Sequence, residues 1–205
     1  MNSKQLIKES NKTWPLNDYH IIEKLYQQNT FEEIKNQINW KWISKYQKVS
    51  EEFITKYQHK VFWLYISRYQ ILSENFIEKF QYHLEWNKIS FYQNLSEPFI
   101  EKFKDKVFWD NISYKQTLSE PFMEKYQNKV NWFWVSRSQK LSEPFIEKYQ
   151  NKLNWINISR FQKLSESFIE KFYHKVDWME ISMNQNLSKP FIEKYRHKVN
   201  WYYNL

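Results

Sequence analysis

The sequence predicts an all-α protein, an α-solenoid of about eight two-helix repeats of 23 residues. Three observations lead to this fold class. Each unit carries a single apolar stripe at helical spacing, and each clear unit begins with a serine of the kind that caps helices. The third observation is a tryptophan that recurs every 23 residues, at Trp40, Trp63, Trp86, Trp109, Trp132, Trp155, Trp178 and Trp201.

The repeat unit reads LSEPFIEKYQNKVNWxxISxYQK, and positions below are numbered along it from its Leu. A degenerate copy starts at about Tyr26. We therefore expect an N-terminal tail and capping helix over residues 1–25 and the repeat array over 26–205, with residues 1–13 polar and without structure. The seven clear copies start at Val49, Leu72, Leu95, Leu118, Leu141, Leu164 and Leu187.

The first helix of each unit, helix A, is predicted to begin at the serine of position 2. Its hydroxyl can accept from the free amides of the first turn, and four units have proline two places later, where no intrahelical bond is lost. Glutamate early and lysine late match the helix dipole. The apolar stripe occupies positions 1, 5, 6, 9 and 13, which in one copy are Leu95, Phe99, Ile100, Phe103 and Val107.

The second helix, helix B, is predicted to run from the Asn or Asp that precedes several of the tryptophans, through Trp and Ile, to Gln. Two helices of about eight to ten residues are too short to be stable alone, so stacking on neighbours must bury them. A leucine-rich repeat would need an LxxLxL strand, and a β-helix would need glycine. An open superhelix and a closed ring of helix pairs both fit the pattern.

The unit resembles the LSExFIxxFxxKVxWxxIS tandem repeats found in uncharacterised proteins of giant DNA viruses and of AT-rich bacteria and phages. The resemblance covers residues 26–205, although the first copy has Gln27 in place of Ser and Thr30 in place of Phe. It implies a helical repeat fold and a viral or phage origin. It carries no catalytic or binding residues that could be transferred.

Composition excludes several classes of function. The chain has no Cys, which excludes disulfide scaffolds and thiolate metal sites, and no Gly, which disfavours phosphate-cradling loops and nucleophile elbows. No apolar run approaches the roughly 18 residues of a membrane span. We expect an intracellular, cytoplasmic protein that does not act at a membrane.

The sequence offers little support for an enzyme, a metal site or a cofactor. Serines recur at positions 2 and 19, but no histidine lies at a constant offset from them. His174 and His197 sit on equivalent helices roughly 9 Å apart, too far to share a zinc ion. Carboxylates such as Glu97 and Glu101 recur in copy after copy, which is typical of a helix N-terminus and not of an active site.

Glutamine at position 22 and serine at position 19 are present in every unit that reaches them. Amides stacked once per repeat can bond to the next copy, so we expect a buried or half-buried ladder between repeats. The alternative is that the glutamines recognise nucleic-acid bases.

Positions 16, 17, 20 and 21, on or beside helix B, vary while their neighbours do not. Trp, Tyr, Phe and Arg dominate there, the residue types enriched at binding hot spots, although some could simply pack between helices. A repeat array presents such positions along one face. The predicted partner-binding residues are Trp42, Lys45, Tyr65, Arg68, Lys88, Phe91, Tyr114, Lys115, Phe133, Trp134, Arg137, Arg160 and Phe161.

We therefore expect a non-catalytic binding module that engages a protein or a ribonucleoprotein, and the viral resemblance implies an inhibitor or adaptor of a host protein or nucleoprotein complex. The alternative is an RNA or single-stranded DNA binding protein, because basic residues interleaved with aromatics suit a nucleic-acid path. The lysine and glutamate columns of helix A nearly cancel, so the net charge of +8 comes mainly from the varied positions and the termini.

The C-terminal end of the array lacks the polar outer face of a capping repeat. Phe191, Ile192, Tyr195 and Val199 keep the internal pattern, and the chain stops shortly after Trp201. We expect this end to be covered by a second copy in a homodimer, or by its own aromatic tail folded back.

Overall fold

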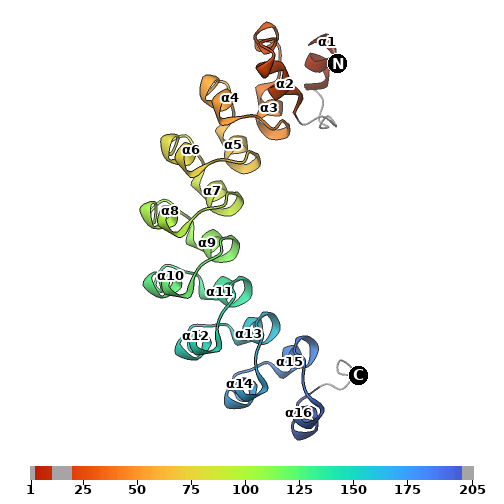
Figure 1. Cartoon of the computed structure of the whole chain (residues 1–205), viewed down its shortest axis with the longest axis vertical. Coiled ribbons are helices and arrows are strands. Elements are labelled where there is room, and N and C mark those ends of the chain that lie inside the picture. The colour runs from red at the N-terminus through yellow and green to blue at the C-terminus, as the bar shows by residue number, and fades with distance from the viewer. Residues whose placement is uncertain (1–2, 11–19, 200–205) are drawn as a thin grey trace. The chain divides into compact units, whose positions relative to one another are not determined.

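The computed structural model describes residues 3–10 and 20–199, which form sixteen α-helices, one 3-10 helix and no strand (Figure 1). Two helices recur per repeat, so the predicted all-α solenoid of tandem repeats is confirmed. The chain divides into two compact units, Met1–Val107 and Phe108–Leu205, and each is described on its own.

Helix A has six residues in every clear copy and begins as predicted. In the second unit, Ser142 Oγ accepts from the Phe145 amide at 3.3 Å, which satisfies one of the free donors of the first turn. The A helices are α4 (Glu51–Lys56), α6 (Glu74–Lys79) and α8 (Glu97–Lys102) in the first unit, and α10 (Glu120–Lys125), α12 (Glu143–Lys148), α14 (Glu166–Lys171) and α16 (Lys189–Lys194) in the second.

The apolar stripe reaches position 13 and so predicts a longer helix A than the structure has. In the structure, helix A ends at position 8. A tight turn follows, in which the amides of Lys152 and Leu153 both donate to the carbonyl of Tyr149. The turn keeps the position 9 ring and the position 13 side chain on the buried side while the chain reverses toward helix B, which explains why one apolar stripe spans both the helix and the turn.

Helix B has seven residues and ends at the predicted glutamine. Asn131 caps the N-terminus of α11, since its side chain accepts from the amides of Phe133 and Trp134, and Gln139 is the C-cap. The B helices are α3 (Trp40–Tyr46), α5 (Trp63–Tyr69) and α7 (Trp86–Tyr92) in the first unit, and α9 (Trp109–Lys115), α11 (Trp132–Ser138), α13 (Trp155–Phe161) and α15 (Trp178–Asn184) in the second.

Within each unit the A helices form one row and the B helices a second row beside it (Figure 1). The core lies between the rows, where Ile146 of helix A and Ile158 of helix B are fully buried. The recurring tryptophan joins successive repeats, because the ring of Trp132 stacks on Tyr149 of the next helix A with centroids 4.9 Å apart. Its Nε1 donates to the carbonyl of Gln127 at 2.9 Å.

The predicted glutamine ladder is confirmed. Gln139 Nε2 donates to the carbonyls of Ser113 and Gln116 of the preceding repeat, both at 2.8 Å, and its Oε1 accepts from the Leu118 amide at 2.9 Å. Gln139 is buried, and both ends of its amide are in use. Base recognition by these glutamines is therefore wrong, since the amide edges that would read a base are bonded inside the protein.

The serine of position 19 forms a second link between repeats. Ser136 Oγ donates to the carbonyl of Trp132 at 2.6 Å and accepts from the amide of Asn154 in the next repeat at 2.9 Å. The same pattern recurs at Ser113, which accepts from the Asn131 amide. These hydroxyls are fully buried and committed to the backbone, so they serve the fold.

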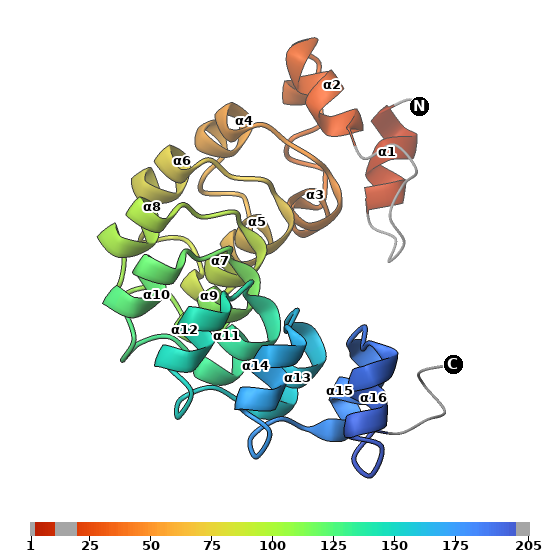
Figure 2. The same ribbon diagram turned by 60° about the horizontal axis from the view of Figure 1, so that its bottom comes forward.

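The N-terminal region departs from the predicted polar tail, because residues 3–10 form a helix, α1 (Ser3–Ser10). Leu6 is buried in one hydrophobic cluster with Ile22 of α2 (Ile21–Gln27) and Trp42 of α3, and Figures 1 and 2 both place α1 beside these helices. Burial of the Leu6 side chain stabilises the folded form of this otherwise polar segment.

Helix α2 takes part in the array through the bonds that later repeats use. Its Glu23 accepts from the amide of Ser50 at 2.8 Å, much as Glu51 accepts from Ser73. Between α2 and α3 the chain forms a short 3-10 helix, η1 (Phe31–Glu33), whose Phe31 is buried. The first copy thus keeps the contacts of the repeat with a longer and more irregular helix A region.

At the C-terminal end, Trp201–Leu205 lie outside the described residues, and the homodimer through this end stays a prediction. Phe191, Ile192 and Val199 are buried in the structure. None of the described helices combines the length and the apolar character needed to cross a membrane.

Candidate binding face

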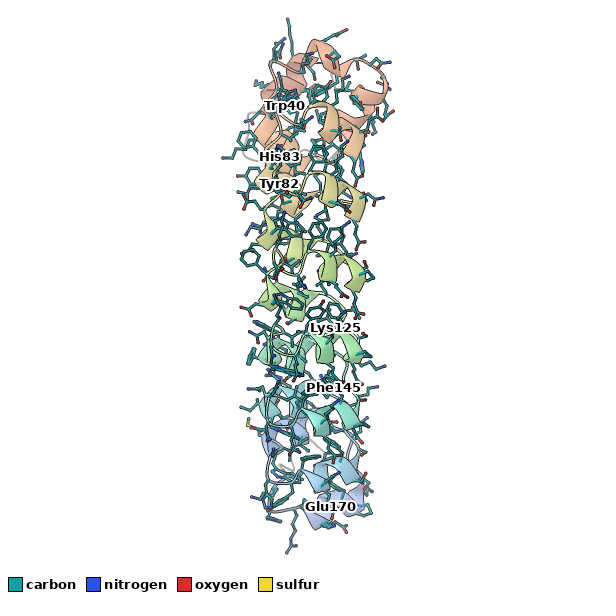
Figure 3. All side chains as sticks on the ribbon, turned by 90° about the vertical axis from the view of Figure 1, so that its left-hand side faces the viewer. Trp40, Tyr82, His83, Lys125, Phe145 and Glu170 are labelled. Carbon is teal, nitrogen blue, oxygen red and sulfur yellow. The ribbon has the colours of Figure 1, made fainter. Side chains whose placement is uncertain are left out.

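The charges on the helix A side pair with each other from one repeat to the next. Lys148 Nζ lies 2.5 Å from Glu124 Oε1, and Lys171 Nζ lies 2.6 Å from Glu147 Oε1. Figure 3 views this side, with the A-helix residues Lys125 and Glu170 labelled. The position 8 lysines are therefore paired with the position 7 glutamates of the preceding repeat, whereas the position 12 lysine Lys152 donates to the neutral amide of Gln127 at 2.8 Å.

The glutamate of position 3 is also engaged between repeats. Glu120 accepts from both the amide and the hydroxyl of Ser142, at 2.6 and 3.0 Å. This carboxylate holds the start of the next helix A, at the end where negative charge is favoured. The recurring carboxylates and hydroxyls of the A side thus hold successive A helices together.

The opposite side, which we call the B face, consists of positions 16, 17, 20 and 21 of the B helices and position 23 of the loop that follows each of them. The predicted binding residues all belong to helix B, and six of them are exposed: Arg68, Lys115, Phe133, Arg137, Arg160 and Phe161. Six more are half-buried: Lys45, Tyr65, Lys88, Phe91, Tyr114 and Trp134.

Trp42 is the exception, and its assignment to the binding surface is wrong. Its side chain is only 3% exposed and belongs to the N-terminal hydrophobic cluster with Leu6. Position 17 is half-buried in most repeats and buried at Asn157, and at the first copy it is covered further, because Trp42 lies in one cluster with Leu6 of α1 and Ile22 of α2. Trp42 therefore contributes to the fold and cannot contact a partner.

In the first unit, cations of the B face stack on rings. The guanidinium of Arg68 lies 5.0 Å from the ring of Tyr69 and 5.1 Å from the ring of Tyr92 in the next repeat. Lys45 lies 4.7 Å from the ring of Tyr46, and the hydrogen bond to the Tyr46 hydroxyl raises the pKa of this lysine. These contacts hold the long cationic side chains along the helix row.

In the second unit the same arrangement involves other residues. The ring of Phe161 lies 5.2 Å from the guanidinium of Arg137 and 5.4 Å from that of Arg160, and Arg160 also pairs with Glu180 at 3.6 Å. Trp134 packs on Tyr114 of the preceding repeat with centroids 4.5 Å apart. The structure thus brings predicted residues of neighbouring repeats together across the row of B helices, as in the pairs Arg137–Phe161 and Trp134–Tyr114.

Two kinds of B-face residue were not among the predicted binding residues. Position 16 carries large apolar side chains that face solvent, with Ile156 53% exposed and Met179 61% exposed. Position 23 carries Lys140 and Lys163, which are exposed and make no ion pair among the described residues. In the sequence, Ile156 and Met179 look like core residues because they are aliphatic. Lys140 and Lys163 lie in loops outside the helical pattern. For these reasons the sequence did not identify either kind of residue as a binding residue.

In the part of the chain that the structure describes, no three His, Cys, Asp or Glu side chains gather in a group able to hold a metal ion. Comparison of the chain with family models, with curated proteins and with solved structures finds no match.

Proposed function

We propose that the protein is a non-catalytic binding module that docks another protein on its B face. The observation that carries the proposal is the contrast between the two sides of each unit. Cations lie against rings on both sides. The A side pairs its position 8 lysines with glutamates between repeats, whereas the B face carries a series of large apolar side chains that face solvent, among them Phe133, Ile156 and Met179. Surfaces that combine exposed apolar groups with arginine and aromatic residues are typical of binding sites.

The exposed apolar residues of the second unit lie on consecutive B helices. Phe133 of α11 is 45% exposed, and Ile156 of α13 and Met179 of α15 occupy the same repeat position. Neighbouring B helices contact each other, so these side chains form one row. Burial of such a row by a partner would contribute roughly 25 cal/mol per Å² of apolar area removed from water.

The cation and ring contacts prepare the B face for binding. Arg137 is already held against Phe161 and against Trp134. A side chain that is ordered before binding loses less conformational entropy when the partner arrives, which favours affinity. The recurring serines, glutamines and glutamates are committed to bonds between repeats, and this supports a binding role over a catalytic one.

The aliphatic residues favour a protein partner over nucleic acid. Ile156 and Met179 have no ring on which a base could stack, and apolar side chains of this kind gain most from contact with apolar protein surface. An inhibitor or adaptor that acts on a host protein or nucleoprotein, as the resemblance to viral repeats implies, would use such a surface.

The second candidate is RNA or single-stranded DNA binding, and the contacts of Arg68 favour it. This guanidinium lies between the rings of Tyr69 and Tyr92 in adjacent repeats, an arrangement that could meet phosphates and bases in turn. Nucleic-acid binding would depend steeply on salt.

Site-specific photocrosslinking tests the proposal. A photoreactive phenylalanine analogue replaces Phe133 on the B face or, as the matched control, the exposed Pro144 on α12 of the A side. In nuclease-treated extract of cells that express the protein, we expect a discrete protein adduct from position 133 and none from position 144. Equal adducts from both sides, or no adduct from position 133, would contradict the proposal, and an adduct that nuclease removes would favour nucleic acid.

A further inference from the structure

The second unit contains a hollow of about 630 Å³ on the loops that follow α11 and α13. Its polar lining comes mainly from Arg137, Ser138, Lys140 and Lys163, and Phe161 forms part of its wall. These residues belong to two successive repeats, so the hollow exists only where the repeats stack. We call it the loop hollow.

A small residue lies at the edge of the hollow where several other repeats carry a ring. Position 21 carries a large ring in several repeats, among them Tyr69, Tyr92 and Phe161, but in the copy that contains α11 it is Ser138. Since Ser138 fills far less volume than a tyrosine, space remains between its loop and the ring of Phe161 in the next repeat.

The charges around the loop hollow favour an anion. Lys140 and Lys163 have no ion-pair partner among the described residues, and Arg137 contacts rings. The one carboxylate of the lining, Glu143, accepts from the amide of Ser165 at 2.6 Å and so is already engaged. Three cations therefore face one occupied carboxylate.

Two of the carbonyls near the end of α11, which would repel an anion, are engaged. Gln162 Nε2 donates to the carbonyls of Ser136 and Gln139, at 3.0 and 2.8 Å. The glutamine ladder thus satisfies part of the negative end of the helix. The cations available to an anion in the loop hollow are the side chains of Arg137, Lys140 and Lys163.

We propose that the loop hollow binds an acidic peptide segment of the partner protein, with carboxylates on Lys140 and Lys163 and an apolar residue against Phe161. This inference rests on the proposed function, because it names the chemistry that the B face recognises. Phe161 is an exposed large apolar residue, so the hollow offers apolar contact beside its cations.

The distribution of the cations favours a peptide over a nucleic-acid strand. A strand that follows the array would need a cation in each repeat, but position 23 is Thr117 before the hollow and Asn186 after it. In the second unit the unpaired lysines of position 23 lie in two neighbouring loops, and the other lysine at this position is Lys48 of the first unit. A local group of cations suits a short acidic segment, whereas a regular track of them would suit a phosphate backbone.

The test uses a short fluorescein-labelled peptide in which Asp and Glu flank a central Leu and Phe, with binding followed by fluorescence anisotropy on the full chain. We expect Lys140→Gln with Lys163→Gln to weaken binding about tenfold or more, the size of effect that loss of close charge pairs produces. The matched control, Lys148→Gln with Lys171→Gln, removes the same charge from the A side of the same unit and should leave affinity unchanged.

A second variant separates shape from charge. Ser138→Tyr restores the ring that other repeats carry at this position, so the fold should tolerate it, and it should abolish binding without changing net charge. Circular dichroism on each variant verifies folding.

Three results would overturn the inference: no binding of the peptide by the unmodified chain, equal losses in the two lysine pairs, or full binding by Ser138→Tyr. Oligouridylate RNA that binds more tightly than the peptide and loses affinity in the Lys140/Lys163 variant would assign the hollow to nucleic acid instead. A protein adduct from position 133 that persists in the Lys140/Lys163 variant would leave the proposed function standing while the inference fails.

Discussion

The side-chain amide of Gln162 donates to the backbone carbonyl of Gln139, 23 residues earlier, at 2.8 Å, and Gln139 makes the same bond to Gln116. Within each unit the ladder therefore bonds the end of one helix B to the end of the next. Because Gln139 is bonded at both ends of its amide, its removal should leave the Ser113 and Gln116 carbonyls and the Leu118 amide without this partner.

We predict that Gln139→Ala lowers the free energy of unfolding by about 3 to 5 kcal/mol, since three buried backbone groups lose their partners at roughly 1 kcal/mol or more each. Gln185→Ala is the matched control. Gln185 makes the same kinds of bond but is half-buried, so water can replace part of what is lost, and a smaller effect is expected. Urea denaturation followed by circular dichroism measures both, and equal losses would contradict the prediction.

Adjacent aromatic residues on α11 should differ sharply in their effect on stability. Trp132→Ala should cost about 3 to 5 kcal/mol, because the ring packs between repeats on Tyr149 and Phe145. Phe133→Ala should cost less than about 1 kcal/mol, because its side chain faces solvent. Thermal melts compare the two, and an early melt of the Phe133 variant would place this residue in the core.

The double variant Trp134→Ala with Arg137→Ala should remove partner binding while the fold remains. Trp134 packs on Tyr114, so we expect a stability loss of about 1 to 2 kcal/mol, smaller than that of Trp132→Ala. The photocrosslink from position 133 provides the binding readout and thermal melting the stability readout. If the double variant melts as early as Trp132→Ala, these residues belong to the core, and the assignment of Trp134 and Arg137 to the binding face is wrong.

Glu32 should make stability depend on pH in the acid range. Hydrogen bonds from Lys35, Tyr57 and Lys56 lower the pKa of Glu32 from 4.5 to about 2. Because the folded-state pKa is lowered, the contribution is complete above the unfolded value and is lost as pH falls from about 4.5 through about 2.

Glu32→Gln should therefore flatten this part of the profile, measured as the urea midpoint against pH. Glu33→Gln removes an adjacent exposed carboxylate and serves as the control. The prediction fails if the two variants show the same acid slope as the unmodified chain.

Much of the candidate face could be predicted from the sequence, because strict repetition reveals which positions are free to vary. Arg137, Phe161 and Phe133 were placed correctly on an exposed face of helix B. Trp42 was not, because its exposure depends on α1, which packs from a distant part of the chain. The burial of a varied position depends on which other segments of the chain pack over it, and the residue type at that position does not reveal those segments.

The sequence by itself determined the repeat, the start of each helix and the glutamine ladder. These follow from local rules: a serine caps the amide three residues ahead, and a residue that recurs every 23 positions meets its own copy in the next repeat. The tertiary structure alone decided where helix A ends, which cations rest on rings, and that Ser138 leaves a hollow beside Phe161. Each of these depends on side chains of separate repeats filling or failing to fill a shared volume, which only packing in three dimensions settles.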